Sequence, residues 1–560
     1  MRATDGVGLS IEDTFTVTVH ITQGTTPGSL DLAYNPNVIG TVYSIAAQPD
    51  GKVLLGSTTF TNYFDFGQGV VTRLNADGTS EAGQNLNLDG LLPYDSDSNP
   101  PGILTTAVQS DGKILVGGTF TAFRATPRKN LARFNADGSL DADFNLALNG
   151  SVRCALVQPD GKIVVGGYFT LAAGVTQNHL ARINPDGTLD SSFKPNLDNY
   201  VTCASLQPDG KIIIGGDFGT IGGVVREHCA RLNADGTADA SFNPNPNNPV
   251  ECVVVQPDGK ILIGGEFTSI KGTTRNHIAR LNADGSLDSS FDPNLDANSD
   301  ILSIVLQADA RIIIGGDFRS VGTTARNNVA RLNADGTLDA GFDPRADGGV
   351  RGVVLLADGR VLIAGDFTAV NGEARGQGRG HVARLLNDPA TQSLTAPNGG
   401  RVQWLRGGAS PEAQDVTFDL STDGGGTWTA LGAGDRIAGG WELTGLDLPA
   451  SGLLRARARV VSGSYDGSAG LVETTLTFSA LPAAAPRLTA LTRLGDGSFQ
   501  FGFISRAGLS FTALATTDLS LPVSAWTVIG PATEIAPGQY QVTDSGAANL
   551  GQRSYQIRLP

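Results

Sequence analysis

The sequence predicts an all-β protein: a seven-bladed β-propeller closed by an N-terminal strand, followed by a β-sandwich and a small C-terminal β domain. Three observations lead to this prediction. Glycine makes up 73 of 560 residues while charged residues are only 17%, a balance typical of many short strands joined by tight turns. The phrase QPDGK, or a variant of it, occurs seven times. No helix of useful length fits between the copies.

Composition excludes several classes of function. The formal net charge of -15 argues against nucleic acid or an anionic membrane surface as the main partner. No apolar run approaches the ~20 residues of a transmembrane segment. Four cysteines in a chain of this length do not form a disulfide framework, and their spacing is not that of a zinc site.

The N-terminal residues lack the basic start and apolar core of a signal peptide. Residues 14–22 alternate as a strand and resemble the final strand of cadherin-like or immunoglobulin-like modules of bacterial surface proteins. A single strand does not fold alone. We therefore interpret residues 1–24 as the remnant of a preceding β-sandwich module, with a flexible N-terminal arm as the alternative.

The repeat unit is about 50 residues long and contains two predicted hairpins. In residues 250–298, apolar, β-branched runs flank the triplet PDG at 257–259, which suits a β-turn because proline fixes φ and glycine accepts a positive φ. The ADG triplet at 283–285 repeats this pattern, so each unit has four predicted strands, as in a propeller blade. The first-turn aspartates are Asp50, Asp111, Asp160, Asp209, Asp258, Asp309 and Asp358.

The two ends of the repeat region predict how the ring closes. The seventh unit lacks the SLDxxF half after residues 381–388, and a matching half precedes the first unit at residues 29–36. We expect the N-terminal segment to complete the last blade, which gives a ring over residues 28–388. Tyr34 then stands where most other units carry a phenylalanine.

These units resemble the delta-60 repeat family of bacterial secreted and surface proteins and, more distantly, the NHL class of propellers. The resemblance rests on the QPDGK and ADGSLDxxF phrases over about two-thirds of the chain. It implies a propeller fold and an extracellular or cell-surface location, although this chain shows no signal peptide. The family has no established activity to carry over.

Residues shared by the units are interpreted first as serving the repeat. We favour an arginine–carboxylate clamp within or between blades, which suits the planar guanidinium group. The alternative is an acidic ring that binds calcium or a cationic ligand. The repeated arginines include Arg182, Arg231, Arg280 and Arg331, and the repeated acids are Asp217, Glu266, Asp317 and Asp366.

Histidine and cysteine follow the same period. His179, His228, His277 and His381 precede the third predicted strand, and Asn328 replaces histidine in the sixth unit. Equivalent points on neighbouring blades are too far apart to share one metal ion unless they lie near the axis, so we expect these side chains to cap the strand backbone. Small residues occupy one position of the first, innermost strand, and they predict a narrow, plugged or water-lined tunnel with free thiols; they include Cys154, Cys203 and Cys252.

Three departures from the repeat stand out. Ala310 replaces the left-handed turn glycine of the sixth unit. An insertion in the first unit carries Tyr94, Asp95, Asp97 and Asn99, and one in the seventh carries Arg375 and Arg379; we take these six as candidate binding residues. Asp95, Asp97 and Asn99 resemble half of a calcium loop without its glycine and final glutamate, so a solvated acidic loop is favoured and calcium is the alternative.

The repeat ends at about residue 389. Residues 389–480 alternate like an immunoglobulin- or fibronectin-like sandwich and contain STDGGGTW at 421–428, the Asp-box hairpin known from sialidase propellers. Residues 481–486 are a linker by composition. Residues 487–560 resemble small C-terminal modules of large exported proteins, and sorting signal and structural cap remain equal alternatives.

No Ser-His-Asp set, convincing carboxylate pair or phosphate loop is found, so the sequence predicts no catalytic residue and no resident cofactor. The favoured function is a secreted or cell-surface binding or adhesion scaffold for a glycan, a peptide or another surface protein. We expect a monomer or one part of a longer chain. A propeller-based polysaccharide hydrolase or lyase and a structural spacer are the alternatives. Converging carboxylates or an aromatic pair from non-equivalent repeat positions would mark the site.

Overall fold

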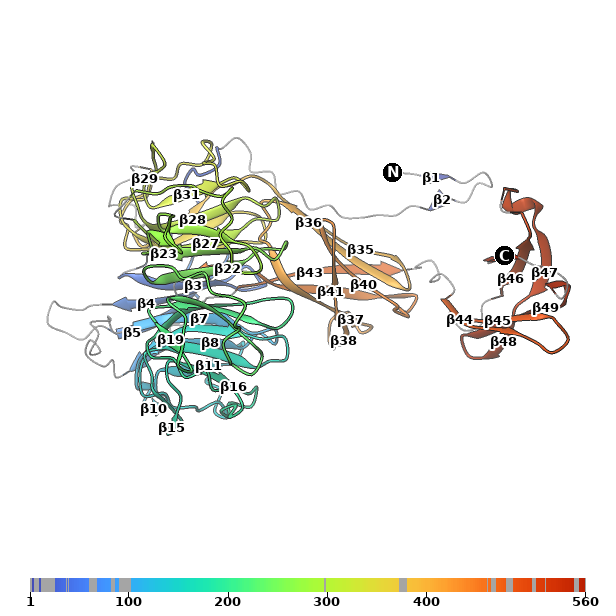
Figure 1. Cartoon of the computed structure of the whole chain (residues 1–560), viewed down its shortest axis with the longest axis horizontal. Helices are drawn as coiled ribbons and strands as arrows, with labels where there is room; N and C mark the ends of the chain where they lie inside the picture. Colours follow the sequence, from blue (N-terminus) through green and yellow to red (C-terminus); the bar gives the residue numbers. More distant parts are fainter. Residues whose placement is uncertain are drawn as a thin grey trace. The chain divides into compact units, whose positions relative to one another are not determined.

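The computed structural model forms two compact units (Figure 1). The first contains residues 1–393, 405–417 and 456–474, and the second contains residues 394–404, 418–455 and 475–560. The residues described are 3–4, 10–11, 26–36, 38, 40–59, 68–81, 86–89, 102–296, 299–371, 380–460, 462–464, 470–479, 487–505, 510–518, 520–547 and 553–558. Within these residues no helix is long and apolar enough to cross a membrane.

The first unit contains a ring of seven blades, which confirms the predicted propeller. Each blade has three antiparallel strands that follow one another from the axis outward. The innermost strands are β3 (Val42–Ala47), β7 (Gly102–Val108), β12 (Val152–Val157), β17 (Val201–Leu206), β22 (Val250–Val255), β27 (Asp300–Leu306) and β32 (Val350–Leu355). The middle strands are β4 (Val53–Thr59), β8 (Ile114–Thr119), β13 (Ile163–Gly167), β18 (Ile212–Gly216), β23 (Ile261–Gly265), β28 (Ile312–Asp317) and β33 (Val361–Gly365). The third strands are β5 (Gln68–Leu74), β11 (Leu131–Phe134), β16 (Leu180–Ile183), β21 (Cys229–Leu232), β26 (Ile278–Leu281), β31 (Val329–Leu332) and β34 (Val382–Leu385).

The predicted fourth strand is reduced to a single bridge in each blade, such as Ile183 with Leu189. The chain turns away after this bridge because the following phenylalanine, Phe193 in this blade, is buried completely. Short two-stranded ribbons between the middle and third strands were not predicted. They are β9–β10 (Ala122–Phe123, Thr126–Pro127), β14–β15 (Leu171–Ala172, Val175–Thr176), β19–β20 (Thr220–Ile221, Val224–Val225), β24–β25 (Ser269–Ile270, Thr273–Thr274) and β29–β30 (Ser320–Val321, Thr324–Ala325). In the first blade β6 (Leu86–Asp89) pairs with both β5 and β9.

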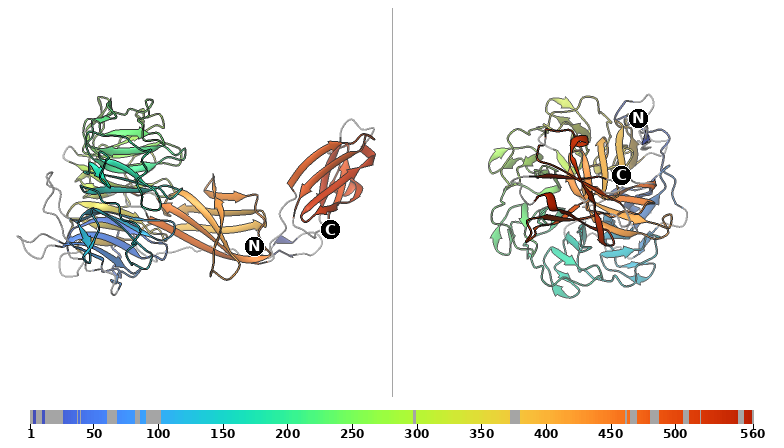
Figure 2. Two further views of the ribbon diagram at one scale, coloured as in Figure 1. Left: turned by 90° about the horizontal axis from the view of Figure 1, so that it is seen from below. Right: turned by 90° about the vertical axis from the view of Figure 1, so that its right-hand side faces the viewer.

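The N-terminal segment closes the ring as predicted. Leu30 bridges Leu385 of the last blade, and the amide of Asp31 donates to the carbonyl of Arg384 at 2.8 Å. The innermost strands contact one another in chain order, and β32 of the seventh blade contacts β3 of the first. Figure 2 (right) shows the blades around the ring from blue through green to yellow. The strand expected at residues 14–22 lies outside the described residues. Of the N-terminal segment before it, the structure describes β1 (Ala3–Thr4), which pairs with β2 (Ser10–Ile11).

Neighbouring blades are held together by an aromatic ring under a turn glycine. Phe242 is fully buried, and a Cβ on Gly285 of the next blade would lie 2.8 Å from its ring. Gly285 has a φ of +84°, so both the turn conformation and the close approach require glycine here. Tyr34 makes the same contact with Gly78 of the first blade, which closes the packing around the ring.

The strands that follow the ring form two four-stranded sheets, β35-β36-β40-β39 and β38-β37-β41-β43. Five of these strands contain residues of both units. Their bounds are β35 (Ala390–Asn398), β36 (Arg401–Gly408), β37 (Ala413–Ser421), β38 (Thr429–Ala433), β39 (Asp435–Ile437), β40 (Gly440–Thr444), β41 (Ser451–Val460) and β43 (Gly470–Ser479). In the predicted Asp-box, Asp423 accepts hydrogen bonds from the Thr427 amide at 2.9 Å and hydroxyl at 2.8 Å.

The C-terminal residues form two further sheets, β44-β45-β49-β48 and β47-β46-β50, around a core of aromatic side chains. Phe503 stacks on Tyr540 at 5.3 Å between ring centroids, and Phe511 packs edge-on against both. The elements are β44 (Arg487–Arg493), β45 (Phe499–Ile504), β46 (Thr512–Thr516), η1 (Val523–Ala525), β47 (Thr527–Pro531), β48 (Thr533–Ala536), β49 (Gln539–Asp544), η2 (Ser545–Ala547) and β50 (Ser554–Arg558). The immunoglobulin-like assignment and the domain boundaries stay predictions.

Candidate functional site

The repeated arginines pair with carboxylates, but with different ones from the four acids singled out in the sequence. Arg182 donates its Nε–H to Asp190 of the same blade at 2.8 Å and an Nη1–H to the carbonyl of Ala234 in the next blade at 2.5 Å. Its guanidinium lies 4.6 Å from the Phe193 ring centroid. Arg231, Arg280 and Arg331 make the corresponding ion pairs with Asp239, Asp288 and Asp339. These arginines therefore serve the scaffold.

The histidines also bind the backbone. The rings of His179, His277 and His381 place Nδ1 3.1 to 3.2 Å from the carbonyl oxygen of the glycine that ends the middle strand, so Nδ1 carries the donated proton. Asn328 accepts a hydrogen bond from the Phe318 amide at 3.1 Å instead. The capping role predicted from the sequence is thus confirmed for these residues but is wrong for His228, whose Nδ1 makes no hydrogen bond within the described residues and lies 3.6 Å from Oδ1 of Asp217. The four cysteines are free and buried.

The four repeated acids lie elsewhere, where each middle strand ends. Asp217 accepts a hydrogen bond from Asn199 at 3.0 Å, and Asp366 forms an ion pair with Arg351 at 2.8 Å. Glu266 and Asp317 occupy the same repeat position in the fifth and sixth blades. The middle and innermost strands are antiparallel, so these acids lie at the end of the ring where the innermost strands begin.

A β-bulge interrupts every innermost strand at this same end of the ring. In the fifth blade the register shifts between Val250 and Cys252, which leaves Glu251 as the extra residue. A bulge re-aims its side chain away from the regular alternation of the strand. This position changes between apolar, polar and charged residues from blade to blade while its neighbours stay apolar or small. Its occupants are Tyr43, Leu104, Arg153, Thr202, Glu251, Leu302 and Arg351.

Side chains from five consecutive blades lie at this end of the ring, either at a bulge or at the neighbouring ends of the innermost and middle strands. Arg153 in the third blade and Glu251 in the fifth interact electrostatically across the intervening blade. Tyr168 and Tyr200 stack with ring centroids 4.1 Å apart, and the Arg153 guanidinium lies 5.1 and 5.5 Å from them. We name this group the axial cluster. It comprises two residues from each of blades three to seven: Arg153, Tyr168, Tyr200, Asp217, Glu251, Glu266, Asp300, Asp317, Arg351 and Asp366.

Two carboxyls of the axial cluster are strongly perturbed. Burial, with the charge of Asp300 as the next cause, raises the pKa of Glu251 from 4.5 to about 8. Burial and the charge of Glu266 raise the pKa of Asp300 from 3.8 to about 7. Glu251 is only 4% exposed. Perturbed pairs of this kind are found preferentially at functional sites.

The channel is occupied below the axial cluster. β42 (Ser462–Ser464) pairs with the free edge of β27, with Ser464 opposite Ser303 and Ser462 opposite Val305. It also contacts β17, β22 and β32, the innermost strands of three other blades that carry cluster residues. The tunnel is therefore plugged by the protein's own chain at this level, one of the outcomes predicted from the small residues of the innermost strands.

The candidate residues of the two insertions are not placed by the structure. Tyr94, Asp95, Asp97 and Asn99, as well as Arg375 and Arg379, lie outside the described residues. Across the described part of the chain, no three histidine, cysteine, aspartate or glutamate side chains are grouped as metal ligands.

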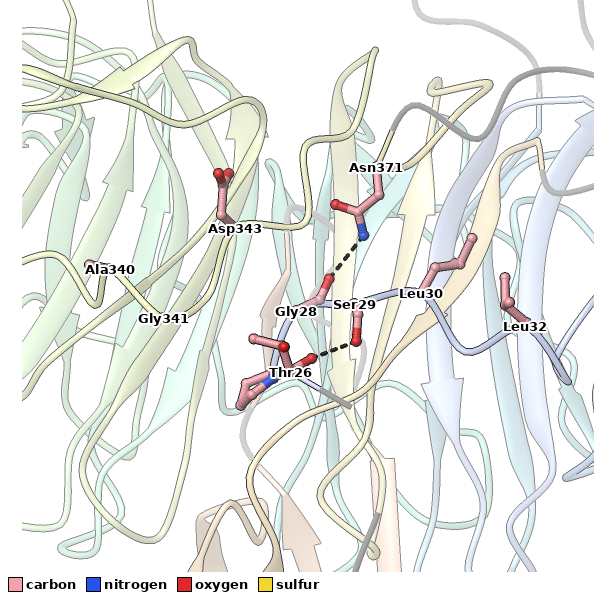
Figure 3. A pocket seen from close by; sticks show the side chains of 10 residues that line it. Thr26, Gly28, Ser29, Leu30, Leu32, Ala340, Gly341, Asp343 and Asn371 are labelled. Atoms are coloured by element: carbon pink, nitrogen blue, oxygen red, sulfur yellow. Dashed lines mark hydrogen bonds between the residues drawn. The ribbon is translucent and has the colours of Figure 1, made fainter. Parts of the chain in front are cut away.

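A groove of about 590 Å³ lies beside the ring closure, between the N-terminal segment and the sixth blade (Figure 3). The Asn371 side chain donates to the carbonyl of Gly28 at 3.2 Å on one side of it. Its charged side chain, Asp343, forms an ion pair with Arg345 at 2.8 Å. The groove is open and offers few polar groups, so the axial cluster is the better candidate site.

Sequence reasoning found four of the six acids of the axial cluster but missed Glu251 and Asp300 at its centre. Glu251 and Asp300 look isolated along the chain, because their neighbours come from other blades. One signal was present: the residue after the first valine or isoleucine of each innermost strand varies freely in an otherwise constant repeat.

The repeats match the family model of a domain of unknown function, the DUF5122 β-propeller. The matched residues are 48–82, 109–144, 158–193, 207–242, 256–291, 307–342 and 356–388. Each segment runs from the first turn of a blade toward the phenylalanine that packs against the next blade, so the model describes the scaffold. No curated protein matches the sequence.

Several solved structures resemble this chain at low similarity. PorZ, a surface component of the type-IX secretion system of Porphyromonas gingivalis, is 12% identical with a TM-score of 0.38; the match covers 78% of this chain and 59% of PorZ. Sqt1 from Chaetomium thermophilum is 13% identical with a TM-score of 0.33 over 80% of this chain and 98% of Sqt1. Likeness at this level says nothing about ligand or activity. Repeats of the kind described by the DUF5122 β-propeller model are therefore present in all seven blades of this chain.

Proposed function

We propose that this chain is a binding module of a secreted or cell-surface protein and that its ligand binds at the axial cluster. The observation that carries the proposal is the break in symmetry at the end of the ring where the innermost strands begin. Seven nearly identical blades repeat their scaffold contacts around the ring, yet blades three to seven each present two polar or charged residues at one end of the axis. A scaffold alone gives no reason for this variation.

The architecture suits a preformed binding site. The bulges fix the backbone, and the interblade arginine contacts hold neighbouring blades in register. A ligand therefore meets side chains on a rigid ring and does not have to order a loop, which reduces the entropy lost on binding. The stacked tyrosine pair adds aromatic surface of the kind that is enriched at binding sites.

The hydrolase alternative has one observation in its favour, the neighbouring carboxyls of Glu251 and Asp300. A glycosidase needs one protonated acid and one carboxylate on either side of the scissile bond. Here burial raises both pKa values, and Glu251 is 4% exposed, which gives a sugar ring little access to it. Binding is the function that this geometry supports better.

The test is a mixed array of glycans and peptides probed with the full chain and with a double variant, Tyr168→Ala with Tyr200→Ala. We expect the double variant to lose the ligands that the wild-type chain retains. The matched control is Trp441→Ala, which removes a half-buried aromatic side chain from the second unit. Retention of every ligand by the double variant, with an unchanged melting temperature, would exclude the axial cluster as the site. Turnover of a polysaccharide would establish the enzyme instead.

A further inference from the structure

We infer that the group recognised by the axial cluster is an organic cation, an alkylammonium or guanidinium such as the end of a lysine or arginine side chain. This inference rests on the proposed function and names the chemistry of its ligand. It follows from the charge, the burial and the aromatic surface of the cluster.

The charges of the cluster are unbalanced. It holds six carboxyls against two guanidinium groups. Arg351 is engaged by Asp366 at 2.8 Å, and Arg153 lies against the two tyrosines. Glu251, Glu266, Asp300 and Asp317 therefore share a region in which the protein supplies too little positive charge. Buried carboxylates are stable only when they are paired or hydrogen-bonded.

Two oxygens in this region lack a hydrogen bond within the described part of the chain. They are Oε2 of Glu251 and Oδ1 of Asp300, and both atoms are buried. Buried polar atoms of native proteins are almost always satisfied, so an unsatisfied pair needs an explanation. A donor with several N–H groups would satisfy both carboxyls at once, and ammonium and guanidinium groups are such donors.

The aromatic side of the cluster already accepts a cation. The Arg153 guanidinium lies within 5.5 Å of both tyrosine ring centroids, within the range at which a ring face attracts a positive group. A cationic ligand would thus meet tyrosine rings on the third and fourth blades and carboxyls on the fifth and sixth. An anionic ligand would have to approach against the excess of carboxyls.

Binding of a cation would be linked to proton release. Glu251 faces Asp300, Glu266, Asp217 and Arg153, with Tyr200 and the thiols of Cys203 and Cys252 nearby. Asp300 faces Glu266, Asp317 and Arg351. Because the raised pKa values leave Glu251 largely protonated and Asp300 partly protonated at neutral pH, a cation must displace protons from both groups. A lysine ammonium keeps its own proton to about pH 10, so affinity should rise between pH 6 and pH 8.5.

The experiment is calorimetric titration of the full chain with three probes at pH 6 and pH 8.5. The probes are cadaverine, Nα-acetyl-lysine methylamide and its neutral isostere Nα-acetyl-norleucine methylamide. We expect binding of the lysine probe to strengthen by about tenfold at the higher pH, with proton release, and the norleucine probe not to bind. If cadaverine binds as tightly as the lysine probe, an alkylammonium group alone is enough for recognition. If cadaverine binds more weakly than the lysine probe, the site recognises a lysine side chain within a peptide.

The variants Glu251→Gln and Asp300→Asn should each weaken the cationic probes by about tenfold or more. Asp143→Asn, an exposed carboxyl in the second blade, is the matched control and should bind normally. Glu251→Gln removes a buried acid and should melt no lower than the wild-type chain, so lost binding would not reflect unfolding. Equal binding of the norleucine probe, or unchanged binding by both variants, overturns the inference. Array ligands that need Tyr168 and Tyr200 but carry no cation would overturn it while leaving the proposed function standing.

Discussion

Arg384 in the last blade donates its Nε–H to the carboxylate of Asp31, 353 residues earlier in the chain, at 2.9 Å. The same guanidinium donates an Nη1–H to the carbonyl of Ala76 in the first blade at 2.7 Å. Arg182 makes the equivalent contacts, with Asp190 of its own blade and Ala234 of the next. The closure of the ring therefore reuses the contact that joins most neighbouring blades, with one partner supplied by the N-terminal segment. Between the sixth and seventh blades Arg331 binds the Asn387 side chain instead.

Replacing Asp31 should open this closure. The ion pair is largely buried, and breaking a buried pair by removing one partner destabilises by ~3–5 kcal/mol. We expect Asp31→Ala to lower the melting temperature and to speed hydrogen exchange of the amides in β34. Asp190→Ala breaks the same contact inside one continuous blade and should leave β34 protected. Equal protection of β34 in both variants would show that Asp31 does not hold the closure.

Two turn glycines, one packed against the neighbouring blade and one not, should differ in how much an alanine substitution destabilises the protein. Gly285→Ala places a Cβ at a φ of +84° and 2.8 Å from the Phe242 ring. Gly174→Ala imposes a similar backbone strain, with a φ of +77°, but meets nothing within 4 Å. We expect Gly174→Ala to cost about 1 kcal/mol and Gly285→Ala to cost about 1–3 kcal/mol more, because it also overpacks the core. Denaturant unfolding measures both, and equal losses would refute the packing contribution.

The first turn of the sixth blade contains backbone strain that a single substitution can remove. Ala310 has a φ of +66°, as expected for a residue that replaces the turn glycine. We expect Ala310→Gly to raise the free energy of unfolding by about 1 kcal/mol. Ala308→Gly, in the same turn but without a positive φ, should be neutral or destabilising. A lower melting temperature for Ala310→Gly would contradict the argument.

The axial cluster should make the protein less stable as the pH rises. Glu251 has a pKa of about 8 when folded against an ordinary value of 4.5, so between these values the native state binds a proton that the unfolded chain has lost. The free energy of unfolding then falls by up to about 1.4 kcal/mol per pH unit for this group. We expect the melting temperature to fall from pH 5 to pH 8. Glu251→Gln should flatten this slope, and Asp143→Asn should leave it unchanged.

The aspartates that pair with the repeated arginines predict the opposite pH dependence: at acid pH they should make the protein less stable as the pH falls. Burial alone raises the pKa of Asp141, but hydrogen bonds from Lys113 and Arg133 outweigh it and hold the pKa at about 2. Its stabilisation is complete above the unfolded value of 3.8 and is lost as the pH falls toward 2. Acid titration of the full chain should show cooperative loss of structure in this range. Asp141→Asn should show a lower melting temperature at pH 7 and a smaller further loss below pH 4.

Much of the scaffold was predictable because each of its parts depends on a short stretch of sequence and occurs several times along the chain. The PDG and ADG turns follow from the φ preferences of proline and glycine, and the displaced half at residues 29–36 predicted which segment meets Leu385. Within the repeat, the fourth strand was overestimated: the bridge at Leu189 ends where Phe193 turns into the core. An alternating sequence does not reveal that burial of the phenylalanine competes with continued pairing of the strand.

The candidate site was less predictable. Asp217 and its equivalents were visible as repeated acids, and the favoured interpretation paired them with the repeated arginines. The arginines instead bind the aspartate eight residues further along, as Arg182 does with Asp190. The plug β42 was not predictable either, because its backbone pairing with β27 joins two segments that the sequence analysis assigned to different domains.

By itself, the sequence determined the number of blades, their turns and the closure of the ring, because these depend on local backbone preferences and on a repeat whose copies can be compared. The tertiary structure decided which side chains meet. Arg153, Glu251 and Asp300 come together only because three different blades present them at the same end of the ring, Arg153 and Glu251 from bulges and Asp300 from the first position of its innermost strand. Their burial and mutual repulsion, which set their pKa values, arise from that convergence and are written in no single segment of the chain.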